Sequence, residues 1–150
     1  MTDMDFMKLA IAEAKKAAEE GEIPIGAVLT WRGLLIAADH NRRECRHDPT
    51  AHAEILVLRK VGERLDRWRL TDTALYVTIE PCAMCAGAIM NARVGHLFYG
   101  SDDERAGGVR SAWHICDGTA MNHRIPITRG LCETECRALL DEFFEARRTN

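Results

Sequence analysis

The spacing of apolar and polar residues along the chain predicts four helices and five strands. Apolar residues recur at helical intervals in the helical segments, whereas short runs rich in β-branched and aromatic residues mark the strands. The helices are expected at about residues 4–20, 49–63, 82–91 and 131–148. The strands are expected at about residues 23–30, 34–38, 73–79, 94–99 and 125–127. Residues 101–118 fit neither spacing.

The order of these elements predicts an α/β fold. Strands that alternate with helices favour a central sheet with helices on both faces, which is a three-layer α/β/α arrangement. Trp31-Arg32-Gly33 separates the first two strands and is typical of a hairpin, so these strands should be antiparallel. Helices separate the later strands, which should therefore run parallel. We expect one domain, residues 1–150, built on a mixed five-stranded sheet.

The composition excludes several classes of protein. With 150 residues, of which 47% are hydrophobic and 29% charged, the chain can bury a core without disulfides. A net charge of −3 argues against a general polyanion binder. No apolar run approaches the roughly 18 residues of a membrane span, and the acidic N-terminus differs from a signal peptide. We expect a cytoplasmic protein whose six cysteines are reduced thiols.

Two short motifs carry the candidate chemistry. The first supplies His52 and, two residues later, Glu54, while the second supplies Cys82 and Cys85 directly after a proline. Both fall at the start of an expected helix, where the positive helix end favours thiolates. One imidazole and two thiolates leave a fourth position on Zn²⁺ open for water, and the remaining carboxylate suits a proton carrier. This pair of motifs is typical of zinc-dependent nucleobase deaminases.

A structural zinc site is the alternative interpretation of the motifs, and a non-enzymatic protein, either an RNA-binding or a zinc-structural module, is the more distant alternative for function. Cys116, Cys132 and Cys136 are available to close a four-ligand site with the two motif cysteines. Such a site has no use for the Glu54 carboxylate, which favours catalysis. Cys132 and Cys136 fall in an apolar helix, where buried thiols are the simpler explanation. The sequence assigns no role to these three cysteines.

The sequence around the two motifs resembles the cytidine deaminase superfamily. The resemblance rests on residues 48–55 and 75–89, which contain both motifs. Within the superfamily, the chain is most similar to bacterial tRNA-specific adenosine deaminases, which form inosine at the wobble position. This narrower resemblance rests on Pro24-Ile25-Gly26-Ala27-Val28, Asn41, Met121-Asn122-His123-Arg124, Glu135-Cys136, Phe143-Phe144 and Arg147-Arg148.

The resemblance implies a fold, a cofactor and a set of functional residues. It implies a cytidine-deaminase-like fold, one Zn²⁺ per subunit held by His52, Cys82 and Cys85, and Glu54 as the catalytic proton shuttle. It also implies a homodimer that binds the tRNA anticodon loop, with the target base flipped out of its stack. The residues that would contact substrate are Asn41, Ala53, Pro81, Asp103, Arg105, Phe144 and Arg147.

Several features leave the substrate open. The aromatic and arginine pairs at residues 143–144 and 147–148 would meet RNA, but packing and the helix dipole are the alternative explanation. Asp102 and Glu104 add negative charge where a phosphate backbone would approach. Related superfamily members act on guanine, cytosine, isocytosine or triazine-like rings, so a free nucleobase or nucleoside is the alternative substrate. Residues 42–48 lead into His52 and are expected to line the pocket mouth.

Overall fold

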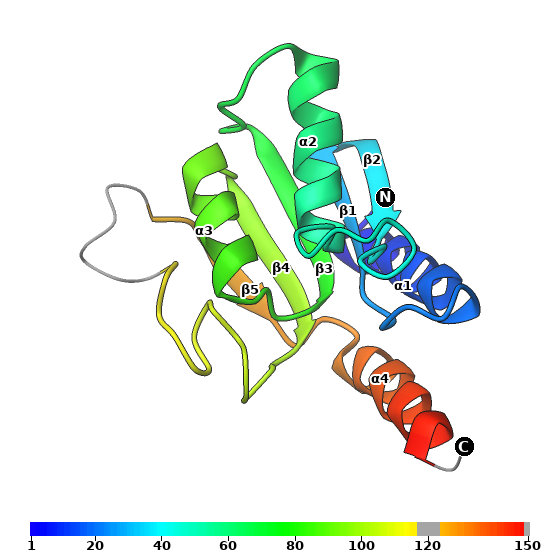
Figure 1. Ribbon diagram of the computed structural model, residues 1–150. Helices are drawn as coiled ribbons and strands as arrows, with labels where there is room; N and C mark the ends of the chain where they lie inside the picture. Colours follow the sequence, from blue (N-terminus) through cyan, green and yellow to red (C-terminus); the bar gives the residue numbers. More distant parts are fainter. Residues whose placement is uncertain (117–123, 149–150) are drawn as a thin grey trace.

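The structure, a computed structural model, describes residues 1–116 and 124–148. Within these ranges the chain forms four helices and five strands (Figure 1). The helices are α1 (Asp3–Glu19), α2 (Ala53–Leu65), α3 (Ala83–Ala92) and α4 (Glu133–Arg148). The strands are β1 (Gly26–Trp31), β2 (Leu34–His40), β3 (Thr73–Ile79), β4 (His96–Ser101) and β5 (Ile127–Arg129). Met121, Asn122 and His123, to which the family resemblance extends, lie outside the described residues.

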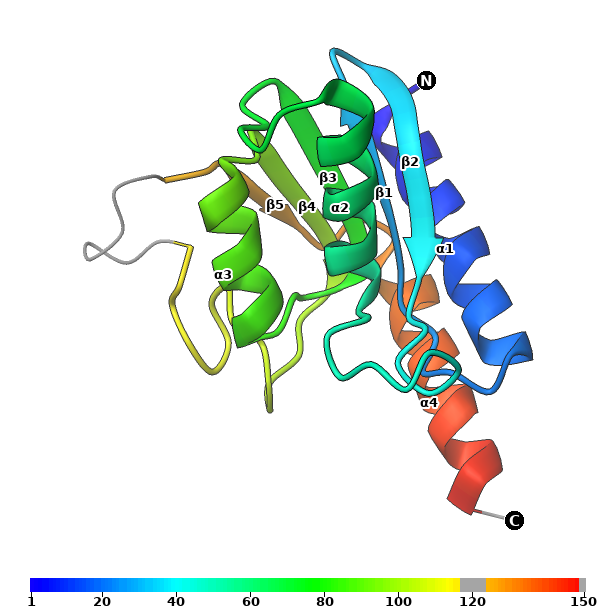
Figure 2. The same ribbon diagram turned by 45° about the horizontal axis from the view of Figure 1, so that its top comes forward.

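The strands form one sheet in the order β2-β1-β3-β4-β5 (Figure 2). Strand β1 is antiparallel to both of its neighbours, β2 and β3. The pairs β3–β4 and β4–β5 are parallel. The predicted hairpin and the predicted parallel strands are thus confirmed, and together they make the five-stranded sheet mixed.

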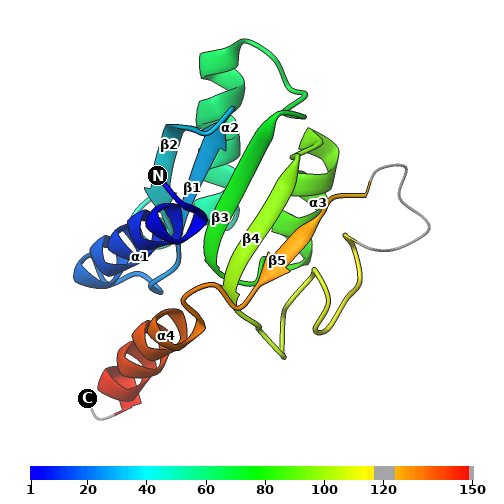
Figure 3. The same ribbon diagram turned by 180° about the vertical axis from the view of Figure 1, so that it is seen from behind.

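Helices cover both faces of this sheet. Helices α2 and α3 lie on one face, and α1 and α4 lie on the other (Figures 1 and 3). Successive strand residues point to opposite faces. In β3, Leu75 and Val77 therefore pack in the core under α2 and α3, whereas Tyr76 packs with Phe6 of α1 and Cys136 of α4. The predicted three-layer α/β/α arrangement is confirmed.

Strand β2 runs two residues further than the sequence predicts. We expected the polar pair Asp39-His40 to end this strand, but both residues belong to it and are buried. Asp39 Oδ1 accepts a hydrogen bond from Arg42 Nε at 2.7 Å, and Asp39 Oδ2 forms an ion pair with Lys60 Nζ at 2.8 Å. His40 Nδ1 lies 3.0 Å from Glu13 Oε1. Arg42 and Lys60 compensate for the buried charge of Asp39, and Glu13 is within hydrogen-bond distance of the His40 ring, so the cluster is explained without a metal ion.

Other element ends also differ from the prediction. Helix α2 begins at Ala53 instead of residue 49, and His52 is its N-cap residue. Thr50, which lies within the expected span of this helix, donates to Asp48 Oδ1 through its backbone N–H at 2.8 Å and its hydroxyl at 2.7 Å. Helix α4 begins two residues later than expected, after Cys132, whose φ of 56° is left-handed. Strands β1, β4 and β5 are displaced by one to three residues. Local side-chain hydrogen bonds and strand pairing set these ends, and hydrophobic spacing does not encode them.

Candidate active site

The starts of two helices converge on the same face of the sheet. Helix α2 follows β2 and helix α3 follows β3, and the two helices lie side by side (Figures 1 and 2). His52 is the N-cap residue of α2, Cys82 is the N-cap residue of α3, and Cys85 lies in the first turn of α3. Their ligand atoms lie within 4.8 Å of one another. The structure therefore brings the three predicted metal ligands together.

The distances between these ligand atoms fit a zinc ion. His52 Nδ1 lies 3.6 Å from Cys82 Sγ and 3.5 Å from Cys85 Sγ. Zn–S bonds of about 2.3 Å and Zn–N bonds of about 2.0 Å at the tetrahedral angle place such atoms about 3.5 Å apart. Among the described residues, no further cysteine, histidine or carboxylate belongs to this ligand group. Three ligands leave one position open, which is typical of catalytic zinc and not of structural zinc.

The two thiols have opposite pKa shifts. The hydrogen bond from Cys85, supported by His52, lowers the pKa of the Cys82 thiol to about 4 despite partial burial. The same hydrogen bond, together with burial, raises the pKa of the Cys85 thiol. Without a metal ion, the pair thus keeps one proton, on Cys85. Coordination to Zn²⁺ deprotonates a thiol outright, so both cysteines can serve as thiolate ligands.

Glu54 lies in the first turn of α2, close to the ligand group but not part of it. Its side chain is buried, and this burial raises the pKa of its carboxyl group to about 7. A carboxyl group with a pKa near neutrality can both accept and release a proton, which general acid–base catalysis requires. The position of Glu54 supports the predicted role of proton carrier.

A cavity of about 420 Å³ opens beside this group. Its lining residues are Ile23, Ile25, Arg43, His52, Glu54, Ile79, Glu80, Cys82, Asp102, Asp103, Arg105, Ala106, Arg137, Leu140, Asp141 and Phe144. They come from the segment before β1, the loop after β2, the start of α2, the end of β3 with the turn into α3, the loop after β4, and helix α4. Of residues 42–48, which were expected to line the pocket mouth, Arg43 lines this cavity. Small-molecule pockets have volumes of about 300–1,000 Å³, so the cavity can hold one nucleoside.

Three of the residues expected to contact substrate, Asp103, Arg105 and Phe144, line this cavity. Arg147 lines an adjoining cavity, where its guanidinium donates to the carbonyl oxygen of Gly21 at 2.7 Å. The loop after β4 and the helix α4 therefore both reach the space next to Glu54. Their contact with substrate remains a prediction.

The other three expected contacts, Asn41, Ala53 and Pro81, are not among the lining residues. The side-chain amide of Asn41 is buried; its Oδ1 accepts from the N–H of Arg43 at 3.1 Å, and its Nδ2 donates to the carbonyl of Ile23 at 3.4 Å. Ala53 is fully buried, and Pro81 directly precedes the ligand Cys82. The described side-chain contacts of Asn41 are thus with the loop that carries Arg43 and with the segment before β1, and direct contact with substrate remains a prediction for all three.

Asp102, which the sequence suggests would repel a phosphate backbone, is neutralised by two arginines. Its Oδ2 accepts from Arg129 Nη1 at 2.9 Å and from Arg110 Nη1 at 3.4 Å. Its Oδ1 accepts from the hydroxyl of Tyr99 at 2.7 Å. The negative charge of this residue at the edge of the cavity is therefore compensated, while Glu104 remains exposed.

The sequence analysis missed Glu80, Arg137 and Asp141, which also line the cavity. Arg137 and Asp141 stand seven and three residues before Phe144, so all three share one face of α4. Helical spacing could have found them from Phe144 alone. Glu80 is a charged residue directly after an apolar strand, and it is buried. Carboxylates are rarely buried unless they are paired.

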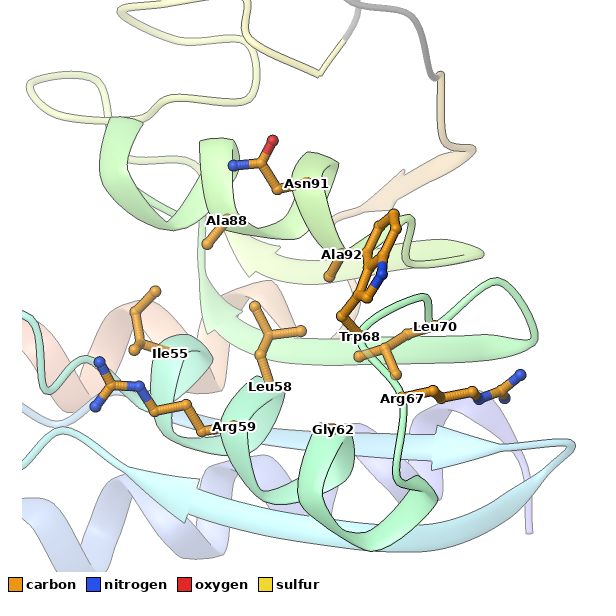
Figure 4. Close-up of a pocket in the computed structure, with 10 residues that line it drawn as sticks. All are labelled: Ile55, Leu58, Arg59, Gly62, Arg67, Trp68, Leu70, Ala88, Asn91 and Ala92. Atoms are coloured by element: carbon orange, nitrogen blue, oxygen red, sulfur yellow. The ribbon is translucent and has the colours of Figure 1, made fainter.

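A larger cavity of about 560 Å³ lies between α2 and α3, away from the metal ligands (Figure 4). Leu58 of α2 and Ala88 and Ala92 of α3 line it, with Trp68 in the loop between α2 and β3. The Trp68 side chain is 63% exposed. None of the predicted site residues lines this cavity, so its larger volume does not identify it as the active site.

The MafB19-like deaminase family matches residues 1–148 of the chain. A tRNA-specific adenosine deaminase of Streptococcus pyogenes serotype M1 is 41% identical over 143 residues, which are 95% of this chain and 84% of that protein. The tRNA-specific adenosine deaminase of Bacillus subtilis (strain 168) is 43% identical over 143 residues, which are 95% of this chain and 89% of that protein.

Two solved structures share the fold but come from enzymes with different substrates. One, from work on A-to-I editing by tRNA:A34 deaminases at the wobble position, is 44% identical with a TM-score of 0.88 and covers 91% of this chain and 99% of its own. The other, a guanine deaminase from Nitrosomonas europaea, is 25% identical with a TM-score of 0.82 and covers 95% of this chain and 84% of its own. Both are enzymes that remove an amino group from a purine ring.

Proposed function

The chain belongs to the MafB19-like deaminase family, and we propose that it is a zinc-dependent hydrolytic deaminase that converts adenosine to inosine at the tRNA wobble position. The observation that carries the proposal is the buried Glu54 carboxyl group beside three converging zinc ligands in one cavity. The cytidine-deaminase-like fold, seen in a tRNA A34 deaminase, supports the reaction. Relatives at 41% and 43% identity support the tRNA substrate.

In the proposed reaction, His52, Cys82 and Cys85 hold one zinc ion per chain, which when bound supplies Lewis-acid activation of a water molecule. Glu54 accepts a proton from the attacking water and gives it to the ring nitrogen N1 of adenosine. It then moves the second proton of that water to the exocyclic amine, which leaves as ammonia. Adenosine and water thus give inosine and ammonia. A carboxyl group with a pKa of about 7 suits both transfers at neutral pH.

Helix α4 is the part of the cavity wall that suits a nucleic acid. Phe144 lines the cavity and is 43% exposed, so its ring is available to stack on a base next to the flipped adenosine. The neutralised Asp102 supports the approach of a phosphate backbone on the other side. We propose that the anticodon loop lies across the mouth of the cavity, with only the target base inside the cavity.

A free nucleobase, of which guanine is the first example, is the alternative substrate. It is favoured by the guanine deaminase that shares the fold at 25% identity and a TM-score of 0.82. The same ligands and the same Glu54 would serve either reaction, so the chemistry alone does not separate the two substrates.

Ammonia release from a panel of substrates separates them. The panel contains an anticodon stem-loop with adenosine at the wobble position, the same stem-loop with guanosine there, and free adenosine, adenine, guanine and cytosine. We expect the zinc-loaded protein to release ammonia from the adenosine stem-loop, with kcat/KM at least about 100-fold above that for any free base, because remote contacts contribute to transition-state binding. Faster release from free guanine would assign the alternative substrate.

We also propose a cytoplasmic location, because the proposed substrate is tRNA. Within residues 1–116 and 124–148, no helix is long and apolar enough to cross a membrane. The proposed zinc ligands include two thiolates, which a reducing compartment keeps available for the metal.

We further propose that the protein is a homodimer, as the family resemblance implies. The cavity between α2 and α3 offers an apolar surface with the exposed Trp68 at its edge (Figure 4). Exposed apolar patches of this kind mark interaction sites, and aromatic side chains contribute most to such interfaces. A second copy that presents the same face would bury Trp68 in a two-fold symmetric interface.

Replacing Trp68 with glutamate should convert the dimer to a monomer. A central tryptophan contributes about 2 kcal/mol or more to an interface, so the dimer dissociation constant should rise at least about 30-fold. Sedimentation equilibrium measures this change. Leu34→Glu, which alters an equally exposed apolar residue at the start of β2, should leave the mass unchanged. A Trp68→Glu protein with wild-type mass would contradict the proposed interface.

A further inference from the structure

Glu80 connects the turn that carries the zinc ligands to a second loop of the same cavity, residues 102–111. It follows β3 directly, stands two residues before Cys82, and is 3% exposed. Its carboxylate accepts hydrogen bonds from the backbone N–H groups of Asp103 (3.0 Å), Val109 (3.2 Å), Arg110 (2.9 Å) and Ser111 (3.0 Å). The hydroxyl of Ser111 donates to it as well.

The 102–111 loop also packs directly on the ligand turn. Gly107 pairs with Cys82 in an isolated antiparallel bridge, and the N–H of Gly108 donates to the carbonyl of Pro81 at 2.7 Å. A Cβ atom at Gly107 would overlap the Glu80 carboxylate, and one at Gly108 would lie 2.7 Å from Cα of Ala83. The loop therefore fits only because both positions are glycine. Its shape depends on the carboxylate that it surrounds.

The part of the loop between its anchoring donors faces the cavity. Asp103, Arg105 and Ala106 line the cavity together with His52 and Glu54. The anchors at Asp103 on one side and at Val109 to Ser111 on the other are bound by the same carboxylate. Hydrogen bonds to an ionised acceptor are about twice as strong as neutral ones. The position of Arg105 relative to Glu54 is thus fixed through Glu80.

We infer that Glu80 is a positioning residue for the reaction, which holds Asp103 and Arg105 around the substrate by organising the 102–111 loop. Both of its carboxylate oxygens are occupied by donors from this loop, so it acts through the loop and not on the reacting atoms. The inference rests on the proposed function. Beyond that function, it identifies the Glu80 carboxylate as the group that sets the shape of the substrate cavity next to the proposed zinc ligands.

Replacing Glu80 with glutamine tests the inference. The amide nitrogen cannot accept from an N–H group, so the loop loses at least one of its backbone hydrogen bonds to this side chain, and the others meet a neutral acceptor in place of a carboxylate. We expect KM for the adenosine stem-loop to rise about 10-fold or more, while kcat changes less than about threefold and zinc stays at about one per chain. A purely structural role would lower the melting temperature and the zinc content without this separation of KM from kcat.

Asp72 provides a matched control at the opposite end of the same strand. It directly precedes β3, as Glu80 directly follows it, and accepts from Trp31 Nε1 at 3.0 Å and Arg67 Nη2 at 2.6 Å. It does not line the cavity. Asp72→Asn should lower stability and leave KM, kcat and zinc content unchanged.

A double-mutant cycle tests the coupling between Glu80 and the loop. Gly107→Ala alone should raise KM about as much as Glu80→Gln, because the new methyl group displaces the carboxylate. In a Glu80→Ala background, Gly107→Ala should have little further effect. Ser111→Ala removes one donor and keeps the backbone bonds, so it should raise KM in the same direction by about two- to threefold. If the other variants fail to fold, the KM of Ser111→Ala alone tests whether Glu80 acts through the loop.

Amide hydrogen exchange tests the same contacts without any substrate. In zinc-loaded Glu80→Gln, we expect the amides of Val109, Arg110 and Ser111 to exchange at least about 10-fold faster than in the wild type, with no change in Asp72→Asn. Wild-type KM and wild-type exchange in Glu80→Gln would overturn the inference. A wild-type protein that fails to deaminate the stem-loop would contradict the proposed function instead, and the exchange rates would still decide whether Glu80 holds the loop.

Discussion

Replacing Glu54 with glutamine is expected to abolish deamination while the protein stays folded and keeps one zinc ion. The amide has nearly the same size as the carboxyl group, so the buried position remains filled. It cannot, however, accept the proton of water or return one to the base. Because both proton transfers in the proposed reaction pass through this group, kcat should fall by about 10³- to 10⁴-fold.

The measurement combines kcat on the adenosine stem-loop with the zinc content of each variant. A fall in kcat at full zinc content separates loss of the proton carrier from loss of the metal. Asp72→Asn, which alters a carboxylate at the far end of β3, should keep wild-type kcat. Turnover in Glu54→Gln within about tenfold of the wild type would assign the proton transfers to another group.

Replacing Cys85 with alanine should remove both the zinc ion and the activity. Cys85 is fully buried and lies 3.5 Å from His52 Nδ1, so its loss leaves only two of the three ligands. We expect zinc to fall well below one per chain and turnover to fall below detection, because the metal supplies the activated water. Stability should fall too, by about 2.7 kcal/mol where free zinc was 100-fold above its dissociation constant.

Cys136 offers a matched control for this variant. Its thiol is also fully buried, but it lies on α4, packs among apolar side chains of α1 and the sheet, and belongs to no ligand group within the described residues. Cys136→Ala should lower the melting temperature slightly and keep one zinc ion and wild-type turnover. Elemental analysis and thermal unfolding measure both variants. Full zinc occupancy in Cys85→Ala would contradict the proposed ligand set.

The zinc ligands could be predicted from the sequence because their geometry is local. Cys82 and Cys85 are three residues apart at a helix start, so their sulfur atoms share one side of α3. His52 likewise stands at the start of α2. The order of strands and helices was sufficient for the layered fold, because right-handed crossovers allow few arrangements.

The end of β2 could not be predicted, because some of the side chains that stabilise it lie far away in the sequence. Asp39 and His40 look like strand-breaking residues until their partners are known. Arg42 is close in sequence, but Lys60 on α2 and Glu13 on α1 are more than 20 residues away, in opposite directions. These side chains meet only when both helices pack against β2.

The residues that line the cavity also could not be predicted from local sequence patterns. Residues 101–118 show no hydrophobic spacing, since the 102–111 loop is held by the Glu80 carboxylate and not by a core face. Phe144 was expected near substrate only from the family resemblance. Its packing beside the cavity depends on where α4 crosses the sheet, which no motif encodes.

The most direct test of the proposed function is inosine formation in an anticodon stem-loop in water enriched in ¹⁸O. We expect the zinc-loaded protein to convert the wobble adenosine to inosine with one ¹⁸O at C6, because hydrolysis places the water oxygen there. A stem-loop with its adenosine moved one position should remain unmodified. Absence of inosine at the wobble position from zinc-loaded protein, alongside turnover of free guanine, would contradict the proposed function.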